Sequence, residues 1–224
     1  PLPVVKTDDQ GNVHDALTDP EQRYRMRYVD LVVNPGVKET FLKRTRIFNA
    51  MRASFQEAGY LEVDTPVLQP IPGGAAARPF ATHHNALDVP FFLRIANELY
   101  LKRLIVGGFD GVFEFSRNFR NEGMDRTHNP EFTIMEMYVA WRDYRWMMGF
   151  MERMLEQVCI AANGTSSATF KENTLQFTAP FKRITMCGSI REKTGKDVLE
   201  MDEPGLRSLC ATNGIHVEPS MGKG

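Results

Sequence analysis

Two segments in which apolar and polar side chains alternate constrain the fold of this chain more than any other feature. They cover residues 112–120 and residues 132–141. Because successive side chains of a β-strand point to opposite faces, this alternation predicts two extended strands, each with one apolar face that a core can bury. We expect them to pair as antiparallel strands of an α+β domain. The opposite face then gathers an arginine, an aromatic ring, two carboxylates and a phenol, namely Glu114, Arg120, Phe132, Glu136 and Tyr138.

The connection between these strands is longer than a hairpin requires. It spans eleven residues from Asn121 to Glu131, whereas about two to five residues are usual. An ordinary hairpin with a solvated polar face explains the alternation alone, but loops of this length are typically binding elements. An arginine suits phosphate oxygens, a phenylalanine ring suits a base, and carboxylates suit a cation. The pattern therefore predicts a ligand that combines a nucleotide with a cationic group. The loop itself contributes further charged or titratable side chains: Glu122, Asp125, Arg126 and His128.

The segment from Phe119 to Tyr138 resembles motif 2 of the class II aminoacyl-tRNA synthetases. It reads FRNEG, then HNPEFT, then a glutamate and a tyrosine, in the form found in lysyl-tRNA synthetases. The resemblance implies an antiparallel sheet flanked by helices, with motif 2 at about 112–141, and a catalytic fold that is incomplete at its C-terminal side. Aspartyl and asparaginyl relatives share the arginine and the PEF sequence but differ at Asn121, His128, Asn129 and Glu136.

The rest of the chain follows the same family order. Residues 1–33 resemble the linker from an N-terminal OB-fold anticodon-binding domain that the chain lacks, and residues 34–224 resemble part of the catalytic domain. Apolar residues at helical spacing predict a helix that starts at Asn34 and Pro35 and stops at Gly59. This helix and the strand after it resemble motif 1, at about 36–68, which implies a homodimer interface.

The resemblance assigns roles to single residues by their match to the family motifs. Arg120 is the expected catalytic residue, because it matches the arginine that bridges the α-phosphate of ATP and the carboxylate of the amino acid. The residues implied in ATP binding are Arg120, Glu122, His128, Asn129 and Phe132. Those implied in lysine binding are Gly74, Glu98, Arg120, Glu136 and Tyr138.

Two of these positions have simpler explanations from the residues alone. Glu98 falls in the first turn of a predicted helix that Asn97 caps, where a carboxylate favours the helix dipole. Gly74 falls in the small-residue segment 71–80, which is typical of a flexible linker or of backbone that a ligand can approach. The resemblance favours a substrate contact at both positions.

The implied reaction is the activation of L-lysine by ATP, followed by transfer to tRNA(Lys). The lysine carboxylate attacks the α-phosphorus and pyrophosphate leaves, so the protein positions the reactants and neutralises charge, with Mg²⁺ sharing that task. No segment of the sequence resembles the glycine-rich motif 3 or the acidic magnesium ligands before it, which we expect in a missing C-terminal part. We therefore expect this polypeptide alone to form no lysyl-adenylate.

Two other functions stay open from the sequence. One is a lysyl-tRNA-synthetase-like ligase that modifies a protein, as the relatives acting on elongation factor P do. The other is a non-catalytic fragment that dimerises or binds nucleotide without turnover. The reading frame on either side of the segment would discriminate among the three.

Composition argues against several other classes. The 224 residues carry a net charge of −1 with a pI near 6.6, which disfavours a broad nucleic-acid-binding surface. The three cysteines follow no metal-ligand pattern, and we expect reduced thiols in the cytoplasm. No segment is long and apolar enough for a membrane span. His83 and His84 are expected to be structural, because neighbours on a strand point to opposite faces.

Beyond residue 143 the sequence predicts elements but no chemistry. Apolar residues at helical spacing predict a helix over about 144–158. A short hairpin is expected over 168–178, followed by two short helices near 186–193 and 204–213.

Overall fold

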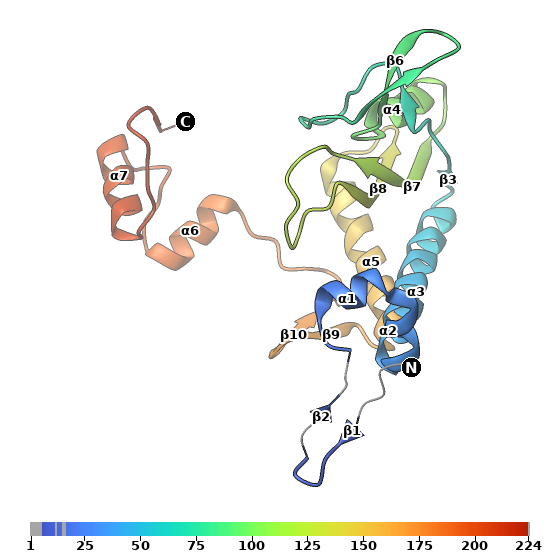
Figure 1. Cartoon of the computed structure of the whole chain (residues 1–224). Helices are drawn as coiled ribbons and strands as arrows, with labels where there is room; N and C mark the ends of the chain where they lie inside the picture. The colour runs from blue at the N-terminus through green and yellow to red at the C-terminus, as the bar shows by residue number, and fades with distance from the viewer. Residues whose placement is uncertain (1–5, 12, 15–16, 224) are drawn as a thin grey trace. The chain divides into compact units, whose positions relative to one another are not determined.

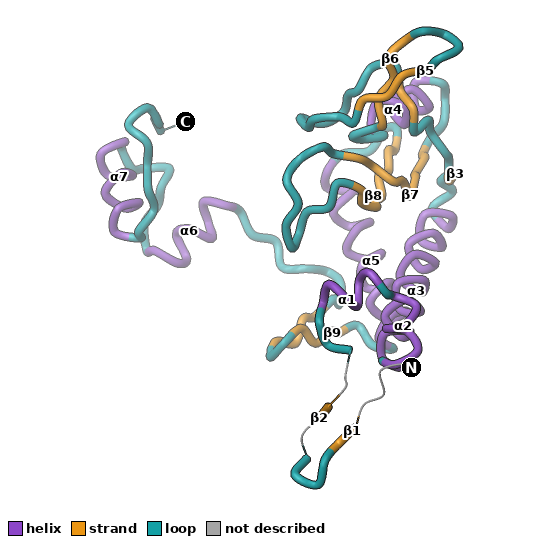
Figure 2. The backbone as a smooth tube through the Cα atoms, in the orientation of Figure 1, coloured by secondary structure: helices purple, strands orange, loops and turns teal. Residues whose placement is uncertain are grey.

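The computed structural model describes residues 6–11, 13–14 and 17–223, and the chain divides after Pro180 into two compact units (Figure 1). The second unit, Phe181–Gly224, contains α6 (Met186–Thr194) and α7 (Glu203–Thr212). In the described part of the chain the strands form two sheets of three strands and two hairpins of two strands (Figure 2). The expected mixed α+β fold, with antiparallel sheets flanked by helices, is confirmed.

The first unit contains, in chain order, β1 (Lys6–Thr7), β2 (Val13–His14), α1 (Pro20–Arg25), α2 (Arg27–Val33), α3 (Pro35–Glu57), β3 (Leu61–Glu62), β4 (Leu68–Gln69), β5 (Ala81–His84), β6 (Val89–Leu93), α4 (Glu98–Val106), β7 (Gly111–Phe119), β8 (Glu131–Val139), α5 (Tyr144–Asn163), β9 (Ser167–Phe170) and β10 (Asn173–Gln176).

The two strands expected from the alternation are β7 and β8, which pair along their whole length in an antiparallel register. β3 pairs with β7 in parallel, which gives the sheet order β3-β7-β8. The register places Glu114 opposite Glu136 and Asn118 opposite Phe132. The predicted polar face is therefore one surface shared by both strands, and the connecting loop runs from Arg120 to Pro130.

The apolar face of β7 and β8 packs against α3 and α5 (Figure 1). Phe113 is fully buried, and its ring centroid lies 4.5 Å from that of Phe55 on α3. Phe150 and Met154 of α5 complete the buried cluster. Burial of a side chain of this size contributes about 1.5–3 kcal/mol, so this cluster fixes the sheet against both helices.

α4 contacts the polar side of β7 and β8, and its first turn departs from the prediction. Asn97 occupies the N-cap position, but its side chain makes no capping hydrogen bond. Its Nδ2 donates to the buried carboxylate of Glu114 at 3.0 Å. The expected side-chain cap is wrong, because the backbone of Asn97 is itself helical, with a φ of −104° and a ψ of 0°, whereas a capping residue has an extended backbone. The Asn97 Oδ1 that would cap the helix is buried without a hydrogen-bond partner among the described residues.

The segment expected as a linker is folded into α1 and α2, immediately before α3. Asp30 of α2 is fully buried, and it accepts from Arg23 Nε at 2.9 Å and from Asn34 Nδ2 at 2.8 Å. Arg27 pairs with the same carboxylate. This cluster ties both short helices to the start of α3. The role of residues 1–33 as a connection between domains stays a prediction, and residues 1–5, 12 and 15–16 lie outside the described part.

Most of the remaining elements are confirmed. Gly59 follows α3 with a φ of +80°, a conformation that favours glycine at a helix end. α5, the hairpin β9–β10, α6 and α7 match the elements predicted after residue 143. The strand predicted over 132–141 is too long at its end, because β8 already ends at Val139. Trp141 lies in the following turn with a φ of +59° and is 95% exposed. None of the helices in the described ranges is long and apolar enough to cross a membrane.

Candidate active site

The residues predicted to bind ATP surround one cavity of about 530 Å³. It is formed by the loop that follows β7 and by the start of β8. A cavity of this size accommodates a nucleotide-sized ligand. The predicted residues Arg120, Glu122, His128, Asn129 and Phe132 all line it, together with Gly123, Met124, Asp125 and Thr127.

Arg120 and Phe132 supply the charge and the aromatic surface of this cavity. The guanidinium carbon of Arg120 lies 5.1 Å from the centroid of the Phe132 ring. Arg120 Nε donates to the Ile95 carbonyl at 3.5 Å, and its terminal N–H groups have no hydrogen-bond partner among the described residues. A planar guanidinium with free N–H groups suits phosphate oxygens.

The small-residue segment 71–80 is bonded to the loop that carries this cavity. The Asn121 backbone N–H donates to the Arg78 carbonyl at 2.8 Å. The Glu122 carboxylate accepts from the Arg78 backbone N–H at 3.4 Å. These two hydrogen bonds hold the segment beside the predicted ATP residues at Arg78. A flexible linker would not need such contacts.

Gly74, in the same segment, lies against the start of α4. Its φ is +86°, and a Cβ at this position would lie 3.1 Å from the Cβ atoms of both Ala96 and Glu98. A side chain here would be strained in its backbone and would crowd Glu98. The structure therefore brings two of the predicted lysine-binding residues together.

Glu98, Glu136 and Tyr138 form an acidic group in which the charge of Glu98 acts on both of the other residues. Tyr138 Oη donates to Glu136 Oε2 at 3.2 Å. Burial, together with the charges of Glu98 and Glu114, raises the pKa of Glu136. Burial and the charges of Glu136 and Glu98 also raise the pKa of the Tyr138 hydroxyl. Arg120 lowers the pKa of Glu136, so the arginine of the nucleotide cavity lies within electrostatic reach of this group.

The amine of Lys102 shows what the acidic group attracts. Lys102 lies one helical turn after Glu98 and pairs with its carboxylate through Nζ. The same ammonium lies 5.9 Å from the centroid of the Tyr138 ring. A glutamate and a lysine four residues apart often pair on exposed helices. Here the pair also places a primary ammonium beside two residues predicted to bind a lysine side chain.

Sequence reasoning missed the buried ion pair of Arg94 and Glu114. Arg94 Nη1 donates to Glu114 Oε1 at 2.7 Å, and the two side chains are 5% and 2% exposed. Thr65 Oγ1 and Asn97 Nδ2 donate to Glu114 Oε2 at 2.7 and 3.0 Å. A buried carboxylate with this many donors is fully satisfied and holds its neighbours in one arrangement.

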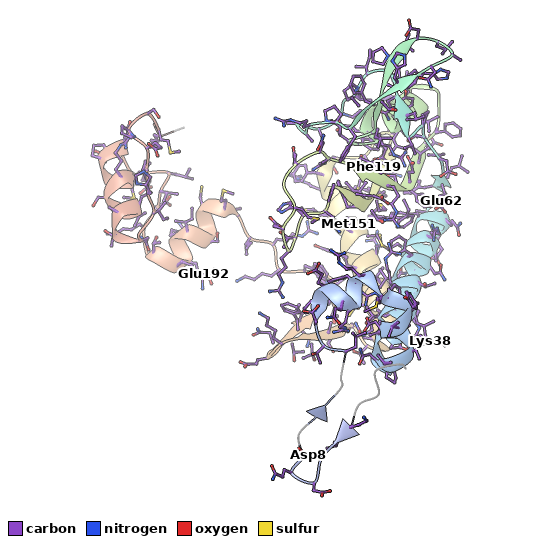
Figure 3. The ribbon with its side chains drawn as sticks, in the orientation of Figure 1. Asp8, Lys38, Glu62, Phe119, Met151 and Glu192 are labelled. Atoms are coloured by element: carbon purple, nitrogen blue, oxygen red, sulfur yellow. The ribbon has the colours of Figure 1, made fainter. Side chains whose placement is uncertain are left out.

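The residues bonded to this ion pair are sequence neighbours of two predicted site residues, Glu98 and Arg120. Asn97, which bonds to Glu114, immediately precedes Glu98. The backbone N–H of Phe119, the last residue of β7 and labelled in Figure 3, donates to the Arg94 carbonyl at 2.9 Å. Arg120 follows Phe119, so the network fixes the backbone on both sides of the site.

The neighbouring histidines belong to a different part of the structure. His83 and His84 end β5, where His83 Nε2 pairs with Asp88 at 3.0 Å and the ring centroid of His84 lies 5.8 Å from that of Phe91. These contacts agree with the structural role expected for both. Among the described residues, no group of three or more His, Cys, Asp or Glu side chains is arranged to hold a metal ion.

The antiparallel sheet, with an arginine at the end of one strand and an aromatic ring across a nucleotide-sized cavity, fits the class II synthetases. The family model described as tRNA synthetases class II (D, K and N) matches residues 19–218, and the chain belongs to this family. The lysine–tRNA ligase of Porphyromonas gingivalis strain W83 is 66% identical to it over 224 residues. The ligase of the same name from Christiangramia forsetii is 64% identical, and that from Azobacteroides pseudotrichonymphae 59%, over the same length. The whole chain is covered in each case, but it spans only 39%, 39% and 45% of these relatives' own lengths.

Proposed function

We propose that this chain carries the lysine and ATP sites of a lysine–tRNA ligase. The reaction forms lysyl-adenylate from L-lysine and ATP, releases pyrophosphate and passes the lysyl group to tRNA(Lys). The observation that supports it most is the position of Arg120, which lines the nucleotide cavity and also acts on the carboxylate of Glu136. The names of the relatives support the same amino acid and the same acceptor.

In this proposal Arg120 is the catalytic residue. An oxygen of the lysine carboxylate forms a bond to the α-phosphorus, and the bond from that phosphorus to pyrophosphate breaks. Negative charge builds on the α-phosphoryl oxygens, and the unpaired N–H groups of Arg120 neutralise it. Phe132 stacks on adenine, while Glu122, His128 and Asn129 hold the adenosine.

The acidic group selects lysine. Glu98, Glu136 and Tyr138 bind the two amino groups, and Gly74 leaves room beside Glu98. An ammonium placed here relieves the unfavourable environment that raises the pKa of Glu136. The same family covers the D and N types, and an aspartate side chain would meet like charge at both glutamates. Selection therefore combines attraction of one substrate with repulsion of another.

Three further parts of the proposal concern the oligomeric state, the metal ion and the compartment. The first is a homodimer formed through motif 1, and the second is Mg²⁺ that accompanies ATP. The described residues do not form a resident metal site. The third is the cytoplasm as the compartment, because lysine, ATP and tRNA meet there. The dimer is supported by large apolar residues that motif 1 exposes: Phe41, Leu42, Leu61, Val67 and Leu68.

A chimeric enzyme tests the proposal. The matching segment of the Porphyromonas gingivalis ligase is replaced by residues 1–224 of this chain, and ATP–pyrophosphate exchange is measured with lysine, aspartate or asparagine. We expect exchange with lysine and none with the other two. Transfer of labelled lysine to tRNA(Lys), or to a protein, then identifies the acceptor.

Arg120→Ala in the chimera gives the critical comparison. We expect it to abolish exchange, because the charge on the α-phosphoryl oxygens is no longer neutralised. Arg117→Ala is the matched control, since Arg117 lies three residues earlier on β7 and is 57% exposed, and it should keep the activity. A folded chimera without lysine-dependent exchange, or full activity in Arg120→Ala, refutes the proposal.

A further inference from the structure

Asp125 organises the loop between β7 and β8. Its Oδ1 accepts from the backbone N–H of Thr127 at 2.7 Å and from that of His128 at 2.8 Å. Thr127 Oγ1 donates to the same oxygen at 2.9 Å. Nδ1 of the His128 ring lies 2.8 Å from Asp125 Oδ2 and 2.9 Å from Oδ1. One carboxylate thus collects two backbone and two side-chain contacts.

The rest of this loop depends on that carboxylate. The backbone N–H of Asp125 also donates to the His128 carbonyl at 3.1 Å. Within residues 123–129, every hydrogen bond of the described structure involves Asp125, except the 3.1 Å contact between Thr127 Oγ1 and His128 Nδ1. Asx turns often serve loop geometry alone. Here the turn, Thr127 and His128 all line the nucleotide cavity, so the shape of the cavity wall depends on Asp125.

The contacts also determine which nitrogen of His128 carries the proton. The hydrogen bonds from the Thr127 backbone, from the two side chains and from the His128 backbone hold the pKa of Asp125 well below its usual range. An ionised carboxylate only accepts hydrogen bonds, so Nδ1 must be the donor. In the neutral ring Nε2 is then an acceptor, and it has no partner among the described residues. A free acceptor suits the hydroxyl and amino donors of an adenosine.

We propose that Asp125 is a positioning residue that holds the loop and the Nδ1–H tautomer of His128 ready for the adenosine part of ATP. The inference rests on the proposed function for the identity of the ligand. The turn and the tautomer, however, are properties of the chain alone. They can therefore be measured without any ligand.

Nitrogen-15 NMR of the 224-residue chain tests the tautomer directly. We expect the ring of His128 to be protonated at Nδ1 near neutral pH, and Asp125→Asn to remove this preference. The Asn oxygen can still accept from the backbone of Thr127 and His128, so the turn itself is conserved. His83 serves as an internal reference of the opposite kind, because its Nε2 faces Asp88 at 3.0 Å.

Steady-state kinetics of the chimera test the consequence for ATP. Asp125→Asn should raise KM for ATP about tenfold, the effect of one lost charge-assisted hydrogen bond, and leave KM for lysine within about twofold. Asp88→Asn, which alters the other Asp–His pair outside the site, should leave both values unchanged. A merely structural role would move the two KM values together.

The other possible results of the NMR and kinetic experiments each contradict one of the two proposals. His128 protonated at Nε2 in the unaltered chain overturns the inference, as does an unchanged KM for ATP in a variant that has lost the tautomer preference. In both of these cases lysine-dependent exchange by the chimera can stand. A chimera without that exchange refutes the proposed function and the ligand assigned to Asp125 with it, whatever the NMR result.

Discussion

At the scale of single residues, Glu136 carries a cost in stability that the proposed binding of lysine would offset. Its folded-state pKa is raised by burial and by the charge of Glu98. A carboxyl of this kind stabilises the fold while it is protonated, and the contribution is lost as the pH rises through the raised pKa. Above that pKa the ionised group therefore destabilises the ligand-free chain, and under the proposed function the ammonium of bound lysine would offset this cost.

Glu136→Gln should separate these two effects, because it removes the charge and keeps an oxygen that can accept from Tyr138. We expect a higher urea midpoint than the unaltered chain at pH 7, with the difference vanishing below about pH 4, where both side chains are neutral. In the chimera, KM for lysine should rise roughly tenfold or more, while KM for ATP stays the same. Glu131→Gln on the exposed start of β8 is the control. Lower stability at pH 7, or an unchanged KM for lysine, contradicts the assignment.

The positions of single site residues could be predicted where the residues that share a site are also close in the sequence. The predicted ATP residues lie on one loop and its flanking strand ends, so a single hairpin brings them to a common cavity. Arg94 and Glu114 are separated by 20 positions, and their pairing depends on how the segment after β6 lies against β7. Spacing carries no signal for such a pair. The hydrogen bonds of Asp125 could not be predicted either, because they depend on a turn of the loop that composition alone does not define.

At the scale of elements, the ion pair of Arg94 and Glu114 joins the segment between β6 and α4 to β7. Glu114→Ala would leave the Arg94 guanidinium buried without its counter-charge, which costs about 3–5 kcal/mol. The double variant Arg94→Met/Glu114→Leu removes both charges and should be clearly more stable than the single variant. Urea denaturation followed by fluorescence measures both, because Trp146 stacks on Phe150 in the core with ring centroids 5.2 Å apart. A loss below about 1 kcal/mol in Glu114→Ala, or equal losses in both variants, would show that the pair does not hold these elements.

The elements themselves were largely predictable, because apolar periodicity reports which face a core buries. This signal identified β7, β8, α3 and α5, which together form the buried cluster. Apolar periodicity gave the wrong position where a turn of the backbone, and not burial, places the side chain. Trp141 continues the alternation in sequence, but the chain turns before it. The contacts of Asp30 hold residues 20–33 in α1 and α2, and their role as a connection between domains stays a prediction.

At the scale of the whole molecule, the two units differ in what stabilises them. The buried hydrophobic residues all belong to the first unit, and no described residue of the second unit is buried. α7 relies instead on Arg207, which pairs with Glu203 at 3.0 Å and donates to the Pro219 carbonyl at 3.2 Å. Exposed contacts of this kind contribute little. A unit of this size without a core should open locally at a small free-energy cost.

Hydrogen exchange of the 224-residue chain, followed by mass spectrometry, measures this difference. Amides of α6 and α7 should exchange at least about a hundredfold faster than those of α3 and α5, because their opening does not require the buried cluster to separate. Arg207→Ala should accelerate exchange in α7 and leave α3 and α5 unchanged, which separates local opening from global unfolding. Equal protection of both units would mean that the second unit unfolds only together with the first, and that contacts other than a core of its own stabilise it.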